Sequence, residues 1–173
     1  MTTKFNRRSL LASGLLFLLL GVGFWSYFNI DVFGSREPEG QIMSVAMAHE
    51  KARAGEITLV DVRYPGEWRK TGLPASGFAI SMHQDEAKFV SELETAVGGD
   101  KSKPLAVICA GGVRTGYLQD VLRQNGFTQP INVAAGMLGG KYGEGWLKSN
   151  LPTRKWTGKN VAPPHVATPV AQE

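Results

Sequence analysis

Short apolar runs alternate along the middle of the chain with segments whose apolar residues recur at helical spacing. The apolar runs, several rich in β-branched residues, cover 57–62, 78–82, 105–109 and 131–133. The segments with helical spacing cover 45–54, 85–97 and 115–125. Continuous apolar runs predict strands that are covered on both faces, and intervening helices predict parallel connections. We therefore expect an α/β fold with a mostly parallel central sheet of about five strands and helices on both faces.

The N-terminal region carries the longest apolar stretch of the chain. Lys4, Arg7 and Arg8 precede an uncharged segment, 9–30, that is rich in Leu, Phe and Gly. About twenty such residues are enough to cross a bilayer as a helix, and the basic flank is expected to stay in the cytoplasm. The sequence therefore predicts a transmembrane anchor at 1–30, with the domain on the extracytoplasmic, periplasmic side and the membrane as a partner.

A cleaved export signal is the alternative interpretation of the same segment. The residues NRRSLL at 6–11 resemble a twin-arginine signal. Cleavage would release a soluble periplasmic protein, whereas an intact segment would tether it. The sequence does not decide between these two outcomes.

The rest of the chain divides by composition into three parts. Residues 31–41 combine Gly, Pro and charged residues without apolar periodicity, and are predicted to be a linker. Residues 42–158 contain the alternating strands and helices, and are predicted to form one domain. Residues 159–173 contain three prolines and few large apolar residues, and are predicted to be a disordered tail.

Charge and cysteine content exclude several classes of function. The formal net charge is +4, and no basic stripe interleaved with aromatic residues is present, so we expect no nucleic-acid partner. The chain has one cysteine, Cys109, which excludes an intramolecular disulfide and a CxxC metal or redox pair. The histidines are scattered, and none of them is predicted to act as a base or ligand; they are His49, His83 and His165.

Cys109 ends the apolar run 105–109, at the edge of the sheet where parallel α/β folds bind ligands. A short loop that leads into a helix can turn its N–H groups inward, and glycines permit the backbone angles that this needs. The helix dipole and a nearby guanidinium further favour a thiolate over a thiol. We therefore predict that Cys109 is a catalytic nucleophile. The predicted substrate-binding loop consists of Ala110, Gly111, Gly112, Val113, Arg114 and Thr115.

Four segments of the chain resemble one family, in that family's order. The sequence CAGGVR at 109–114 resembles the CxxGxR active-site loop of single-domain rhodaneses. DVR at 61–63, followed by Glu67-Trp68, resembles the family's "DVR…EW" segment. TGLP at 71–74 resembles the "GHIPGA" stretch loosely and lacks its histidine. The residues from 125 to 152 resemble the "GF…GG…W…LP" ending.

This resemblance implies the rhodanese-like fold and a sulfurtransferase activity without a metal or organic cofactor. A small sulfur-containing anion such as thiosulfate would leave its sulfane sulfur on Cys109 as a persulfide. A thiol, cyanide or an acceptor protein would then take that sulfur. From their position near a strand end, Asp61 and Arg63 are themselves expected to be mainly structural, as an ion pair that also supports the loop. The glycine-rich segment 136–146 is longer than in compact members, and is expected to shape the mouth of the pocket.

Two other functions remain open at this stage. A lone reactive thiol outside the cytoplasm also fits a persulfide carrier, a sensor or a protein-binding module that turns over poorly. An arsenate or phosphate-ester enzyme is disfavoured by loop length. Related phosphatases carry one more residue between cysteine and arginine than the four found here.

Overall fold

The structure is a computed structural model that describes residues 40–158. Five strands form one sheet in the order β1-β6-β5-β2-β4, and every neighbouring pair is parallel. The strands are β1 (Gln41–Ile42), β2 (Thr58–Asp61), β4 (Gly77–Ala79), β5 (Leu105–Ile108) and β6 (Pro130–Asn132). The predicted five-stranded, mostly parallel α/β architecture is therefore confirmed.

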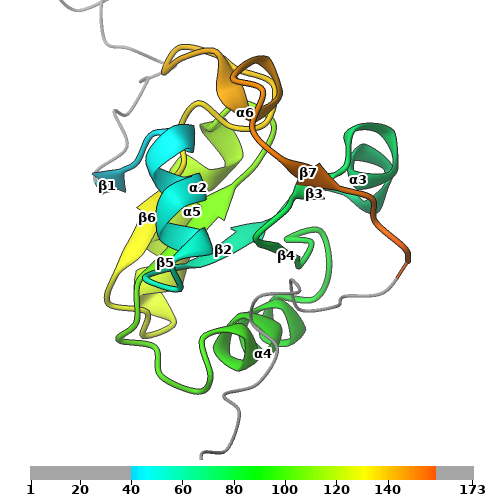
Figure 1. Cartoon of the computed structure of the whole chain (residues 1–173). Coiled ribbons are helices and arrows are strands. Elements are labelled where there is room, and N and C mark those ends of the chain that lie inside the picture. Colours follow the sequence, from blue (N-terminus) through cyan, green and yellow to red (C-terminus); the bar gives the residue numbers. More distant parts are fainter. Residues whose placement is uncertain (1–39, 159–173) are drawn as a thin grey trace, which may run out of the picture. The chain divides into compact units, whose positions relative to one another are not determined.

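Helices cover both faces of the sheet (Figure 1). Helix α2 (Val45–Arg53) lies on one face, and helices α4 (Glu86–Ala96) and α5 (Val113–Gln124) lie on the other. The alternation of side chains along a strand separates the two interiors. In β5, Ala106 and Ile108 face the α2 side, whereas Leu105 and Val107 face α4 and α5.

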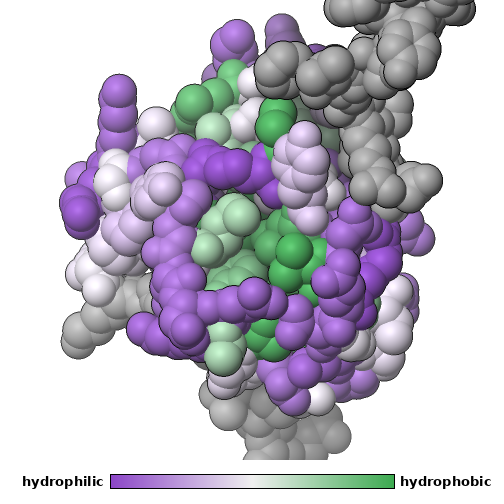
Figure 2. Space-filling view, turned by 180° about the vertical axis from the view of Figure 1, so that it is seen from behind, coloured by the Kyte–Doolittle hydropathy of each residue, from purple (hydrophilic) through white to green (hydrophobic). Residues whose placement is uncertain are grey.

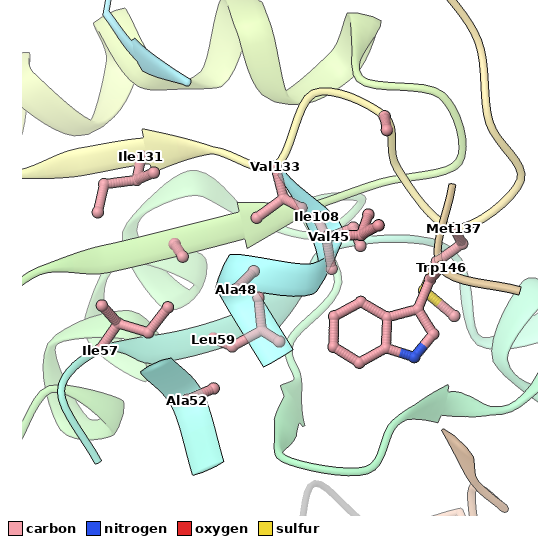
Figure 3. Packing of buried hydrophobic residues seen from close by; sticks show 12 residues of the cluster. Val45, Ala48, Ala52, Ile57, Leu59, Ile108, Ile131, Val133, Met137 and Trp146 are labelled. Atoms are coloured by element: carbon pink, nitrogen blue, oxygen red, sulfur yellow. The ribbon is translucent and has the colours of Figure 1, made fainter. Parts of the chain in front are cut away.

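The interior on the α2 side is almost wholly apolar (Figure 3). Small residues of α2, Ala48 and Ala52, let the helix approach the sheet closely, and the indole of Trp146 closes one end of the cluster. The Ser44 side chain caps α2 by accepting a hydrogen bond from the N–H of Met47 at 3.2 Å, and Gly55 follows the helix with a φ of +73°. These local signals explain why this helix begins and ends close to its predicted bounds.

Several short elements were not predicted from the apolar pattern. Helix α3 (Pro65–Thr71) and helix α6 (Gly145–Lys148) bury one tryptophan each, Trp68 and Trp146. Strands β3 (Leu73–Pro74) and β7 (Thr153–Arg154) pair antiparallel in a separate two-stranded sheet. Elements this short cannot show a repeat in the sequence, because a pattern needs more than one turn or two strand residues to appear.

Some predicted bounds are corrected by the structure. The run 78–82 was predicted as a strand, but β4 ends at Ala79, and Cys109 lies just after β5 rather than within it. Helix α5 begins at Val113, two residues before the predicted start. Both shifts place more of the 109–114 segment at a strand-to-helix junction.

The predicted anchor at 1–30, most of the predicted linker and the predicted tail lie outside the described residues, so these assignments stay predictions. Among residues 40–158, no helix is long and apolar enough to span a bilayer. The face turned away from the viewer in Figure 1 carries hydrophobic residues in a hollow that hydrophilic residues surround (Figure 2).

Candidate functional site

Cys109 lies between the end of β5 and the beginning of α5. Its Sγ accepts a hydrogen bond from the main-chain N–H of Gly112 at 3.2 Å, and lies 3.4 Å from the Oγ1 of Thr115. The residue is only 1% exposed, with Leu118 and Val107 in the same apolar cluster. Burial disfavours a charged sulfur, while the Gly112 N–H and the α5 N-terminus favour it. The loop therefore supplies polar stabilisation at a sulfur that is otherwise surrounded by apolar side chains.

The loop turns back on itself through a glycine that no other residue can replace without strain. Gly112 has a φ of +85°, and a Cβ built on it would overlap the carbonyl oxygen of Ala134. This close approach lets the chain turn within a few residues, so that the Gly112 N–H points at Sγ. The conformation of Gly112 thus determines the position of the donor.

The glycine-rich segment 136–146 packs against the loop, while its expected role at the mouth of the pocket stays a prediction. The N–H groups of Met137 and Leu138 donate to the carbonyl oxygens of Cys109 and Ala110, each at 2.8 Å. Gly111 packs closely against Gly139 of the same segment. A Cβ atom added to Gly111 would lie only 3.3 Å from the carbonyl oxygen of Gly139. These contacts hold the main chain of residues 109–111 next to the sulfur.

Thr115 connects the sulfur to a buried polar residue of β6, Asn132. The Thr115 Oγ1 lies 2.7 Å from the Oδ1 of Asn132, 3.0 Å from the carbonyl oxygen of Gly112 and 3.4 Å from Sγ. A hydroxyl has one proton to donate and can also accept. It can accept from a thiol at Cys109, or turn its proton toward a thiolate. Asn132 was not singled out in the sequence.

Arg114 is held by two residues from other parts of the chain. Its Nη1 and Nη2 donate to the Oε2 and Oε1 of Glu67 at 3.0 and 2.9 Å, and Nη1 lies 3.2 Å from the Nε2 of His83. Hydrogen bonds to Glu67 raise the pKa of Arg114, and the charge of Cys109 adds to that rise. Partial burial would raise the pKa of Glu67, but hydrogen bonds from Arg114 and from the Tyr64 N–H lower it overall. The guanidinium and its carboxylate are therefore both charged at neutral pH.

The ion pair predicted at Asp61 and Arg63 is present, and both residues are buried. The guanidinium of Arg63 donates to both carboxylate oxygens of Asp61 at 2.7 to 3.0 Å. It also donates to the Oγ1 of Thr71 at 2.9 Å and to the carbonyl oxygen of Gly72 at 2.8 Å. Burial raises the pKa of Asp61, and the hydrogen bonds from Arg63 oppose that rise. The pair fixes the turn between α3 and β3, while its expected support of the 109–114 loop stays a prediction.

Within residues 40–158 there is no group of three or more His, Cys, Asp or Glu side chains arranged to hold a metal ion.

Comparison with known proteins assigns the domain to a family. The sequence profile of the rhodanese-like domain matches residues 44–141. The chain belongs to the rhodanese-like domain family. A search among curated proteins finds no match.

Solved structures agree with this assignment of the rhodanese-like domain. The polysulfide-sulfur transferase of Wolinella succinogenes is 26% identical, with a TM-score of 0.52, covering 70% of this chain and 83% of that one. A rhodanese-like domain from Anabaena sp. is 19% identical, with a TM-score of 0.53, covering 78% and 88%. A protein from M. tuberculosis is 22% identical, with a TM-score of 0.51, covering 68% and 98%. The last two support the fold alone.

The rhodanese-like domain brings the predicted loop together around Cys109, but two residues that hold Arg114 were missed. Glu67 was noted only as part of a motif, and His83 was assigned no role. A signal for His83 was available, because it follows the predicted strand 78–82 and the carboxyl ends of parallel strands share one edge of a sheet. The signal for Glu67 is weaker, since it lies 47 positions from Arg114.

Proposed function

We propose that this rhodanese-like domain is a sulfurtransferase that carries sulfane sulfur as a persulfide on Cys109. The observation that carries the proposal is the hydrogen bond from the Gly112 N–H to Sγ at the N-terminus of α5. A donor at this position stabilises negative charge on a sulfur, both on the attacking thiolate and on a persulfide.

The proposed reaction has two displacement steps. The thiolate of Cys109 attacks the sulfane sulfur of thiosulfate, a new S–S bond forms, and the donor's S–S bond breaks with its electron pair leaving on sulfite. A thiolate or cyanide then attacks the outer sulfur of the persulfide. That S–S bond breaks, and its electron pair returns to Cys109 as the thiolate.

Arg114 and Thr115 have separate proposed roles. Arg114 supplies a guanidinium beside the loop, suited to an anionic donor or leaving group, and Thr115 exchanges its hydrogen bond between Asn132 and the sulfur. Thiosulfate is the first donor to test. Polysulfide is the second, because the Wolinella succinogenes relative is described as a polysulfide-sulfur transferase.

A persulfide carrier or sensor with little turnover is the second candidate. Two observations favour it: Cys109 is 1% exposed, and Arg114 is already paired with the carboxylate of Glu67. A donor with a sulfonate group has to compete with that carboxylate for the guanidinium.

Thiocyanate formation from thiosulfate and cyanide tests the proposal. We expect the purified full chain to form thiocyanate catalytically. Replacing the nucleophile, as in Cys109→Ser, is expected to reduce the rate at least about 1000-fold, because no persulfide can form. Sulfur bound to the wild-type protein without turnover would favour the carrier, and equal rates for both proteins would refute a role for Cys109.

We also propose that residues 1–30 tether the domain to the membrane on the extracytoplasmic side. The apolar stretch 9–30 after a basic flank supports this proposal. Immunoblotting of the protein made in cells tests it: a full-length product in the membrane fraction is expected. A shortened product in the soluble periplasmic fraction would instead support a cleaved export signal.

A further inference from the structure

The hydrogen bond between Arg114 and His83 fixes the state of the imidazole. A guanidinium has only donors, so the Nε2 of His83, 3.2 Å from Nη1, must be the acceptor. An imidazole nitrogen accepts only when it carries no proton. His83 in this arrangement is therefore neutral, with its proton on Nδ1.

Neighbouring residues hold the His83 ring in this orientation. The ring stacks on Tyr64, with centroids 3.3 Å apart and planes 8° from parallel. Tyr64 is the N-cap of α3, and its main-chain N–H donates to the Oε2 of Glu67 at 3.0 Å. The same carboxylate oxygen accepts from Arg114. His83, Tyr64 and Glu67 thus form one connected set around the guanidinium.

This set, which we call the Arg114 clamp (Tyr64, Glu67 and His83), acts on the guanidinium of the loop that begins at Cys109. Arg114 lies in the first turn of α5, two residues after the Gly112 whose N–H donates to Sγ, and the charge of Cys109 contributes to raising the pKa of Arg114. Glu67 orients two of its nitrogens, and His83 supplies a further acceptor for Nη1. Without that acceptor, one N–H of Arg114 loses its partner in the clamp, and the guanidinium is less restricted.

Resting on the proposed sulfur transfer, we propose that neutral His83 is a positioning residue, which holds the guanidinium of Arg114 in place for the anionic donor at Cys109. Protonation of His83 removes the acceptor and places a second cation beside Arg114. The hydrogen bond that defines the position is then replaced by repulsion. Sulfur transfer is therefore expected to weaken when His83 is protonated.

The charges around His83 determine the pH at which this happens. Arg114 from α5 and Glu67 from α3 are the charged groups that act on the ring, and Tyr64 stacks on it. His83 is an exposed residue, and partial burial of its ring lowers its pKa; the charge of Arg114 lowers it further, and Glu67 partly opposes both. His83 is accordingly neutral at pH 7. The loss of activity should occur below the ordinary histidine pKa of about 6.5.

The rate of persulfide formation on the full chain, measured from pH 5 to 8 with thiosulfate, tests this role. His83→Gln keeps an acceptor near the Nε2 position and does not titrate, whereas His83→Phe keeps the stacking surface and has no acceptor. We expect His83→Phe to be about 10-fold slower at pH 7.5, the effect of losing one hydrogen bond to a charged group. His83→Gln should recover most of that loss and should lack the acidic decline of the wild type.

The matched control is His49→Gln, which removes a histidine that lies outside the clamp. His49 belongs to α2 and contacts Trp146. This variant should keep the wild-type rate and acidic decline. A His83→Phe variant with the wild-type rate and pH profile would overturn the proposal. So would a His83→Gln variant that keeps the acidic decline.

Nitrogen NMR of the His83 ring separates failure of this proposal from failure of the proposed function. At pH 7.5 we expect Nδ1 protonated and Nε2 unprotonated, whether or not the protein transfers sulfur. A protonated Nε2 would contradict the clamp. Absence of persulfide with the expected tautomer would instead refute the proposed function, and the role of His83 in sulfur transfer with it.

Discussion

Two adjacent strands of the sheet end in buried polar groups of opposite character. After β2, Asp61 and Arg63 satisfy each other, and Arg63 also donates to Thr71 and Gly72. After β5, the sulfur of Cys109 receives a hydrogen bond from Gly112 and shares the hydroxyl of Thr115 with Asn132. The first centre joins elements of the fold through fully paired charges. The second surrounds a single sulfur with one main-chain donor and one hydroxyl.

The difference shows how the fold separates stability from chemistry. Removing either partner of a buried ion pair destabilises the fold, because the remaining charge is left unpaired in the interior. The proposed function, in contrast, requires the sulfur after β5 to gain and lose a second sulfur atom. We therefore expect substitutions after β2 to change mainly stability, and substitutions after β5 to change mainly sulfur transfer.

Removal of the buried guanidinium should have the largest effect on folding. Arg63→Ala leaves Asp61 without its partner, and we expect a loss of about 3–5 kcal/mol in the free energy of unfolding. Denaturant unfolding of the full chain measures this. The double variant Asp61→Asn with Arg63→Met should lose less, since no charge stays buried. An Arg63→Ala variant as stable as the wild type would show that the ion pair after β2 does not stabilise the fold.

Removal of the guanidinium at the other strand end should affect transfer instead. For Arg114→Ala we expect a roughly 100-fold slower sulfur transfer, the cost of losing a charged donor at an anionic site. The Arg114–Glu67 pair is partly exposed, so the stability loss should stay below about 1 kcal/mol. Activity and melting temperature are measured on the same preparation. A large stability loss with unchanged transfer would reverse the assignment.

The smallest expected effect concerns the Thr115 hydroxyl. Thr115→Val keeps the shape of the side chain and removes its hydrogen bonds to the sulfur and to Asn132. We expect sulfur transfer about 3–10-fold slower, because the hydroxyl can no longer donate a hydrogen bond to the sulfur. Thr115→Ser, which keeps the hydroxyl, is the matched control and should retain more activity. If the valine variant were as fast as the serine variant, the hydroxyl would have no role in the reaction.

The sequence predicted the sulfur-bearing loop because the features of that loop are local. Cys109, Gly112 and Arg114 lie within one strand-to-helix junction, and the apolar runs on either side indicate where the strand and helix lie. Four of the five strands of the sheet were predicted for the same reason, since each overlaps a short apolar run. Strand β1 (Gln41–Ile42) was not predicted, because its two residues are exposed, and Gln41 falls in the predicted linker. The predicted ends of a strand were less accurate where the strand is short, as in β4.

The residues around Arg114 were not predicted because they reach it through the tertiary structure. Glu67 comes from α3, which starts at Pro65 and buries only Trp68, so it has no apolar repeat to reveal it. His83 lies in the segment after β4, and its partner is 31 positions away. Asn132 looked like part of an ordinary buried strand, and its contact with Thr115 depends on how β6 lies beside β5.

Intact-mass spectrometry after incubation with thiosulfate shows whether Cys109 takes up a sulfur atom. We expect one added sulfur atom on the wild-type full chain, removed by a thiol reductant, and none on Cys109→Ser. Peptide mapping should locate the sulfur on Cys109. A wild-type protein that shows no added sulfur under these conditions, although its thiol is reduced and the chain is folded, would contradict the proposed function.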